Sequence, residues 1–256
     1  MSAKGGMLTF GGHLEALRKM LLRILGVTLA LGVLIFCFKD WVFPMLLAPR
    51  SNDFITYRWI EQLASAWGYN FHFEPFNIKM INTELSSQFM VHLSTSFYLG
   101  LLLASPYIVF ELFAFAAPAL YDSERRAAYV VVVSVYALFI LGILMSYFTL
   151  FPVALRFLGT YQVDASVGNV INISSYFSTF ITLTFLMGLV FQLPVVCWLL
   201  ERMGIINSDM LRHYRRHAVV IIAVVAAFIT PPDLFTLVLV ALPMYALYEL
   251  SIFIIK

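Results

Sequence analysis

The sequence predicts an all-α, polytopic integral membrane protein with six transmembrane helices and both chain ends on the inner side of the membrane. Two observations predict the class. The chain is 62% hydrophobic and only 12% charged, whereas a soluble domain carries about 25% charged residues. Apolar runs also recur along it, several of them close to the ~20 residues that a helix needs to cross the hydrocarbon core. Lipid must therefore cover much of the surface.

Six segments are candidate membrane spans. The first contains Arg23 one turn from its start, where the side chain can extend to the interface. It ends in the aromatic and charged stretch FCFKDWVF and lacks a small-residue cleavage pattern, so we expect a retained helix and not a removed signal peptide. The predicted spans are 20–38, 88–110, 127–151, a segment within 170–200, 218–229 and 234–255.

The last two spans are predicted to form a short hairpin. They are separated by TPPD at 230–233, where two prolines remove backbone donors and push the preceding residues out of the α region. The twelve residues 218–229 reach only about 18 Å as a helix, against a hydrocarbon thickness of ~30 Å. We therefore expect the last two helices to be short. Either the Pro-Pro turn helps the span 218–229 to reach the far side of the membrane, or the bilayer thins there.

The distribution of lysine and arginine sets the expected orientation. Eleven of the sixteen lie in the N-terminal segment, in the loops after the second and fourth spans, or at the C-terminus. The other side holds Lys39, Arg50, Arg58, Lys79 and Arg156. Both termini are therefore predicted to be inside. The outer loop, about 39–87, is rich in aromatic residues and prolines and is expected to cap a single domain that comprises residues 1–256.

The sequence contains no constellation for an enzyme. The HExxH zinc motif, the GxSxG elbow and the phosphate-binding loop are absent. His213 and His217 have a spacing that could chelate a metal on a helix, but they lie among arginines without a nearby third ligand. A basic loop beside anionic head groups is the favoured interpretation. We expect no catalytic residues, no metal and no cofactor, and a net charge of +2 gives no indication of nucleic-acid binding.

Several segments, in order along nearly the whole chain, resemble the TatC family of twin-arginine protein translocases. They are GGHLEALRKMLLR, FELFAFAAPALY, PALYDSERR, FLMGLVFQLPVV, and ITPPDLFT followed by ALPMYALYELSIF. The resemblance implies a receptor and scaffold in the bacterial cytoplasmic (inner) membrane that exports folded proteins with the proton-motive force. The implied partners are twin-arginine signal peptides of the cargo, single-span TatA- and TatB-type subunits, membrane lipids, and further copies of the chain.

The loop PALYDSERR contains the leading candidate for signal-peptide binding. Arginine presents a planar, permanently charged fork that a carboxylate can accept through two hydrogen bonds. Glu124 matches the family glutamate that contacts the arginine motif, although its position could also stabilise the start of the third helix. Pro118 and Phe115 match family positions beside the loop. Pro118 is expected to end or kink the second helix, and Phe115 could pack on the signal peptide or on the first helix.

The N-terminal segment departs from the family pattern HLxELR. Ala16 stands at the family's glutamate position, and the carboxylate is one residue earlier, at Glu15. One residue corresponds to a rotation of about 100° on a helix, so Glu15 is a weaker candidate for the same ligand. Arg18 matches the pattern and could bind the signal peptide or anchor the helix at the interface.

Three further residues match family positions elsewhere. Gln192 stands where the family commonly has an intramembrane glutamate. Glutamine can form hydrogen bonds but cannot titrate, so we expect it to dock a polar residue of a partner or attract water, or to bond another helix of the same chain. On the outer face, Asp233 could cap the last helix or act in function, and Pro49 is expected to be structural.

A proton-coupled carrier or channel for small solutes is the alternative function. Such a protein needs titratable groups near the middle of the membrane. The predicted spans offer His92, at the edge of its helix, and Gln192, which does not titrate. The sequence therefore favours the receptor.

Overall fold

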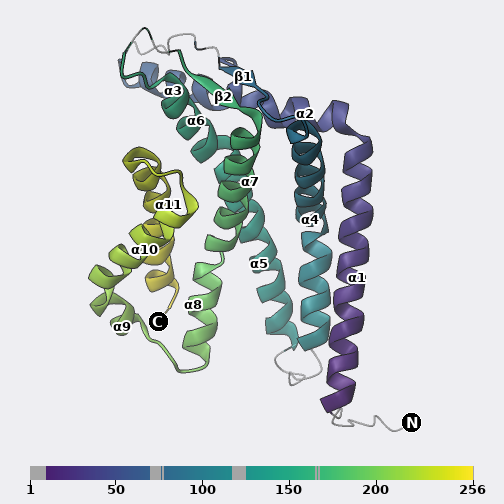
Figure 1. Cartoon of the computed structure of the whole chain (residues 1–256). Helices are drawn as coiled ribbons and strands as arrows, with labels where there is room; N and C mark the ends of the chain where they lie inside the picture. Colours follow the sequence, from purple (N-terminus) through teal and green to yellow (C-terminus); the bar gives the residue numbers. More distant parts are fainter. Residues whose placement is uncertain are drawn as a thin grey trace. The chain divides into compact units, whose positions relative to one another are not determined.

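The computed structural model describes residues 10–69, 76, 78–116, 125–164, 166 and 168–255 (Figure 1). Helices dominate these residues, as the sequence predicts. Two compact units are present: Met1–Phe38 with Leu93–Tyr136, and Lys39–His92 with Ala137–Lys256. In the described part of the chain, five helical segments are long and apolar enough to cross a membrane. They are Gly11–Cys37, Ser87–Phe115, Val131–Thr160, Ile173–Arg202 and Leu234–Ile254.

The first unit contains α1 (Phe10–Cys37) and most of α4 (Ser87–Ala116). Helix α1 begins ten residues before the predicted span because the amphipathic N-terminal segment continues into it without a proline. Pro106 lies inside α4, where it cannot donate to the carbonyl of Leu102. The hydroxyl of Ser105 donates to that carbonyl at 2.6 Å, so the helix passes through the proline with its acceptor satisfied.

Helices α1 and α4 run side by side (Figure 1) and meet through glycines. A Cβ atom added at Gly100 would lie 2.7 Å from the backbone nitrogen of Gly32 and 2.9 Å from the carbonyl oxygen of Thr28. Small residues allow membrane helices to approach this closely, and the packing then provides their association energy. The missing side chain at Gly100 therefore sets the separation of the two helices.

In the second unit, the third predicted span continues past its expected end at 151. Helix α5 (Arg125–Met145), which starts in the first unit, passes through a π-helical turn, η3 (Ser146–Leu150), into α6 (Phe151–Thr160). Pro152 lies in the first turn of α6 and leaves the carbonyl of Phe148 without its helical donor. The hydroxyl of Thr56 bonds that carbonyl. A π-helical turn and an external hydroxyl together allow the helix to continue.

The fourth predicted span is two helices, α7 (Ile173–Val190) and α8 (Leu193–Arg202), interrupted at Phe191 and Gln192. After α9 (Ser208–His213), the hairpin consists of α10 (Arg215–Ile229) and α11 (Leu234–Ile254). The 15 residues of α10 reach about 22 Å, so the prediction of a short helix is right there. It is wrong for α11, whose 21 residues reach about 32 Å, because Pro243 lies inside that helix without ending it.

The described part of the outer loop contains α2 (Lys39–Leu47), the 3-10 turn η1 (Ala48–Arg50) and α3 (Ile55–Ala66). It also contains the strand β1 (Lys79–Ile81), which pairs in parallel with β2 (Val170–Asn172), Met80 standing opposite Ile171. The strand pair was not predicted, because three-residue strands are too short for a detectable alternation of side chains.

Three tyrosines hold the end of α2. Pro49 has no backbone donor, so the carbonyl of Met45 loses its helical partner, and a tyrosine hydroxyl replaces it. Burial raises the pKa of Tyr57, which keeps its phenol neutral and able to donate. The bonds run from Tyr147 to the Met45 carbonyl (2.7 Å), from Tyr176 to that of Leu46 (2.8 Å), and from Tyr57 to that of Pro49 (3.0 Å).

The substitution Gly100→Ala tests the glycine contact. Its Cβ would overlap backbone atoms, which cannot move away as a flexible side chain can, so we expect a destabilisation of about 1–3 kcal/mol. Thermal unfolding of the purified chain in detergent measures it. Gly26→Ala is the control, since nothing lies within 4 Å of a Cβ there. Equal melting temperatures for the two variants would contradict the close approach.

The substitution Tyr176→Phe tests the tyrosine bonds. Tyr176 is 2% exposed, so its loss leaves the Leu46 carbonyl buried without this donor, at a cost of about 1–3 kcal/mol. The same unfolding measurement applies. Tyr161→Phe removes a hydroxyl from a residue that is 63% exposed and should have little effect. A Tyr176→Phe chain as stable as this control would show that the bond contributes nothing.

Candidate functional site

A groove in the first unit lies where the N-terminal half of α1 meets the C-terminal end of α4. Its volume is about 410 Å³. It combines apolar, aromatic and charged side chains from the two segments that carry the family resemblance. The lining residues are Gly12, His13, Glu15, Ala16, Lys19, Met20, Arg23, Ala114 and Phe115.

Phe115 contacts α1 and also lines this groove. Its ring centroid lies 5.6 Å from that of His13, with the planes tilted by 44°. Packing on the first helix, one of the two predicted alternatives, is therefore present. The ring is half-buried, so part of it remains available to a ligand in the groove.

Glu15 and Ala16 both line the groove, so the shift of the carboxylate by one residue does not remove it from this site. The carboxylate of Glu15 lies 2.8 Å from the ammonium of Lys19, and both side chains are about two-thirds exposed. An ion pair in this setting is weak because water screens it. A cationic ligand can therefore compete with Lys19 for Glu15.

Arg18 does not join the other predicted residues. It is exposed and lines a separate, leucine-rich depression on α1, formed with Leu14, Leu17, Leu21, Leu22 and Leu25. A cation beside an apolar helical face is the usual arrangement of an interfacial anchor. The structure thus fits the anchor alternative for Arg18 better than the ligand alternative.

One charged residue of this region was missed. Glu111 on α4 is 5% exposed; the hydroxyl of Tyr107 donates to its Oε1 at 2.7 Å, and Nη1 of Arg23 lies 3.3 Å from the same atom. The predicted second span ended at 110, one residue too early to include it. A longer window would have revealed an acid inside an apolar helix. Arg23, which was expected to extend to the interface, also forms an ion pair with Glu111.

Glu124 and Pro118 lie outside the described residues. Helix α4 is described to Ala116, and α5 begins at Arg125. The assignments of Glu124 to signal-peptide binding and of Pro118 to the end of the second helix therefore stay predictions.

Gln192 lies at the break between α7 and α8. Its Nε2 donates to the carbonyl of Gly188 at 3.2 Å, one turn earlier in the chain. Its Oε1 is buried and has no hydrogen-bond partner in the part of the chain that the structure describes. The side chain is therefore not bonded to another helix there, and a buried acceptor remains for an external donor.

The two outer-face residues have structural contacts. Asp233 is the N-cap of α11: its Oδ1 accepts from the backbone nitrogen of Thr236 at 2.7 Å, and its Oδ2 accepts from the Thr236 hydroxyl. The capping alternative for Asp233 is thus realised. Pro49 is buried in η1 and contributes the carbonyl bonded by Tyr57.

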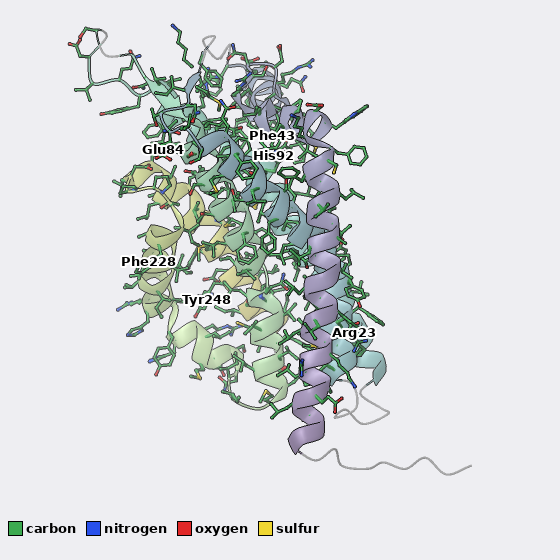
Figure 2. All side chains as sticks on the ribbon, turned by 45° about the vertical axis from the view of Figure 1, so that its right-hand side comes forward. Arg23, Phe43, Glu84, His92, Phe228 and Tyr248 are labelled. Carbon is green, nitrogen blue, oxygen red and sulfur yellow. The ribbon has the colours of Figure 1, made fainter. Side chains whose placement is uncertain are left out.

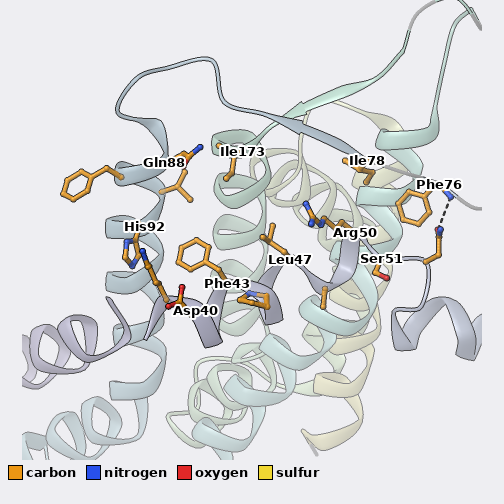
Figure 3. A pocket seen from close by; sticks show the side chains of 16 residues that line it. Asp40, Phe43, Leu47, Arg50, Ser51, Phe76, Ile78, Gln88, His92 and Ile173 are labelled. Atoms are coloured by element: carbon orange, nitrogen blue, oxygen red, sulfur yellow. Dashed lines mark hydrogen bonds between the residues drawn. The ribbon is translucent and has the colours of Figure 1, made fainter. Parts of the chain in front are cut away.

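A larger cavity of about 1190 Å³ lies in the second unit beside α2 and the start of α4 (Figure 3). His92 lines it, and Phe43 meets the His92 ring edge-on at 5.4 Å; both are labelled in Figure 2. The cavity also contains the cations Lys39 and Arg50 and the carboxylate of Asp40. Within the described residues, no three His, Cys, Asp or Glu side chains are grouped to hold a metal ion.

Comparison with known proteins decides the family. The family model for the Sec-independent protein translocase protein (TatC) matches residues 12–243. The chain belongs to the TatC family. It is a multi-pass membrane subunit of Sec-independent protein translocation, a transport component and not an enzyme. This sets aside the small-solute carrier as an alternative.

Relatives and a solved structure agree over almost the full length. The TatC protein of Blattabacterium sp. subsp. Periplaneta americana (strain BPLAN) is 32% identical over 96% of this chain and 94% of its own length. That of Escherichia coli (strain K12) is 33% identical over 94% and 85%. A crystal structure of the twin-arginine translocase receptor TatC superposes with a TM-score of 0.72 at 29% identity, covering 94% of this chain and 97% of that one.

Proposed function

We propose that this TatC-family chain is the receptor for twin-arginine signal peptides and the scaffold of a translocase that exports folded proteins from the bacterial cytoplasm. The groove formed by α1 and α4 carries the proposal. It collects a weakly paired carboxylate, Glu15, and an aromatic ring, Phe115, nine residues before Glu124 in the sequence. The similar crystal structure is that of a twin-arginine translocase receptor, which supports the same ligand.

The chemistry of the groove suits guanidinium groups. A carboxylate accepts the arginine fork through two hydrogen bonds, and an aromatic face adds a cation–π contact. Glu15 can exchange its exposed partner Lys19 for such a ligand, and Phe115 is only half-buried. Glu124, the family glutamate predicted from the sequence, would supply a second carboxylate. Two carboxylates would allow the receptor to bind two consecutive arginines.

The proposed topology has six spans in the cytoplasmic membrane, with both termini inside. Helix α10 is the fifth span, and its 15 residues require local thinning of the bilayer or a contribution from the turn after it. The excess of arginine in the segment that includes α9 and the start of α10 supports an inner location for that loop. The groove near the N-terminus then faces the compartment in which cargo is made.

The partners proposed are single-span TatA- and TatB-type subunits and further copies of this chain. Their docking site includes Gln192, whose buried Oε1 offers an acceptor inside an apolar segment. A polar side chain of a partner helix gains more from this acceptor than from lipid. Because glutamine does not titrate, the proton-motive force acts through another group or through the partners.

A photocrosslinking experiment tests the receptor assignment. With a photoreactive phenylalanine at position 115 in native membranes, a twin-arginine precursor should label the chain, and a twin-lysine precursor should label it at least tenfold less. Glu124→Ala should reduce the twin-arginine labelling to the twin-lysine level. Glu84→Ala, which removes an exposed acid from the outer loop, is the control. Labelling that is the same for both precursors and is unchanged by Glu124→Ala would refute the receptor assignment.

A second experiment tests the docking site. Gln192→Leu removes the acceptor and should reduce copurification of single-span partners and export severalfold, whereas Gln192→Glu keeps an acceptor and should export normally. Gln88→Leu, the loss of an amide near the start of α4, is the control for the change in polarity. Normal export by Gln192→Leu would contradict a docking role.

A further inference from the structure

The buried carboxylate of Glu111 is the charged group that the proposed function leaves without a role. It is 5% exposed and lies within the second candidate span. An acid in this position is expensive to bury and is retained where it pairs with another group or serves function. Arg23 on α1 pairs with it, and Arg23 also lines the groove. The pair therefore connects the groove to Glu111.

A second cluster, around the half-buried acid Glu249, provides a comparison in which both carboxylate oxygens have a hydrogen-bond partner. Glu249 on α11 also has a tyrosine four residues earlier and an arginine from a neighbouring helix. Tyr245 bonds its Oε1 at 2.8 Å, and Arg215 bonds its Oε2 at 2.6 Å. Both oxygens are engaged, and both contacts are short. This arrangement is a structural bond between α10 and α11.

The contacts of Glu111 differ in two respects. Tyr107 and Arg23 both act on Oε1, so neither contact uses Oε2. The contact from Nη1 of Arg23 is 3.3 Å, against 2.6 Å for Arg215. Arg23 also divides its guanidinium between Glu111 and the carbonyl of Lys19, which its Nε reaches at 3.3 Å. The pair is therefore loose, and another guanidinium could engage the carboxylate more fully.

The side chain of Arg23 is exposed enough to move away from Glu111. Its side chain is 59% exposed while that of Glu111 is 7% exposed, and Figure 2 labels it on α1 toward the N-terminal end. A long arginine side chain at such a boundary can turn out to water or head groups at little cost. Glu111 cannot leave in the same way, since Tyr107 holds it and packing surrounds it. A ligand that enters the groove therefore meets Arg23, which lines it and contacts the buried Glu111.

We propose that Glu111 is a further signal-peptide carboxylate at the inner end of this groove, and that Arg23 occupies it until an arginine of the signal peptide takes its place. The proposal rests on the proposed function. It adds a buried carboxylate to the exposed one that Glu15 already contributes to the α1–α4 groove. It also favours arginine over lysine, because only the planar fork can reach both oxygens while Tyr107 stays bonded.

A competitor role for Arg23 and a purely structural ion pair predict different effects on peptide binding when Arg23 or Glu111 is removed. If Arg23 is a built-in competitor, its removal strengthens peptide binding, whereas removal of Glu111 weakens it. If the pair only joins α1 to α4, both removals disturb the same contact and change binding in the same direction. The double variant separates the cases further, because no gain from removing Arg23 is possible once Glu111 is gone.

The experiment measures the affinity of the purified full chain in lipid nanodiscs for a fluorescent twin-arginine peptide and for its twin-lysine form. For the twin-arginine peptide, Glu111→Gln should weaken binding about tenfold or more, and Arg23→Gln should strengthen it severalfold. The double variant should bind like Glu111→Gln. Arg23→Lys keeps a cation beside Glu111 for folding and should give a smaller gain. Arg215→Gln, at the fully engaged pair, is the matched control and should give no gain.

The outcomes separate the two levels of the argument. If the wild-type chain discriminates between the peptides but Glu111→Gln binds as tightly, or Arg23→Gln and Arg23→Lys both weaken binding, this proposal is overturned and the receptor assignment stands. If the wild-type chain binds both peptides equally, the receptor assignment fails and this proposal fails with it. Thermal unfolding of each variant identifies any loss of fold, and the Arg23→Lys result then decides.

Discussion

The fold depends on one constraint: a polar group that lipid or packing hides from water must find its partner inside the chain. Prolines illustrate this constraint. Each lacks a backbone N–H, so the carbonyl four residues earlier in the helix needs another hydrogen-bond donor. In this chain, side-chain hydroxyl groups donate to the carbonyls that the prolines leave without a donor. The pairs are Tyr147 with the Met45 carbonyl near Pro49, Ser105 with the Leu102 carbonyl at Pro106, and Thr56 with the Phe148 carbonyl at Pro152. Helix α4 therefore continues past Pro106, and α6 continues past Pro152.

The same constraint governs two acids, the half-buried Glu249 and the buried Glu111. Glu249 is satisfied completely by Arg215 and Tyr245 and fixes the last hairpin. Among the described residues, the printed contacts of Glu111 come from Tyr107 and the exposed Arg23 and reach a single oxygen, and we propose that a cationic peptide engages this carboxylate more fully. Gln192 is a related case without charge, since its Oε1 is buried and has no hydrogen-bond partner among the described residues.

Much of the fold was predictable, because apolar length and the proline turn are local properties of the sequence. The extent of α1 and α6 was not, since both extend through segments whose continuation depends on external hydroxyls or on amphipathic packing. The pairing of Met80 with Ile171 joins residues far apart in the chain and leaves no local pattern. At the site, the family pattern located Phe115 and Glu15. It could not separate Arg18 from them, because which face of α1 contacts α4 is a tertiary property, and Glu111 lay one residue beyond the predicted helix end.

The proposed binding step is an exchange of guanidinium groups on the carboxylate of Glu111, and a high-resolution structure of the chain with a bound twin-arginine peptide tests it directly. The distances to measure are those from Glu111 to the peptide's arginine and to Arg23. The account predicts a peptide guanidinium within hydrogen-bond distance of both Glu111 oxygens, with Arg23 turned away from its present 3.3 Å contact. A bound peptide whose arginines lie elsewhere, with Arg23 still on Glu111, would contradict it.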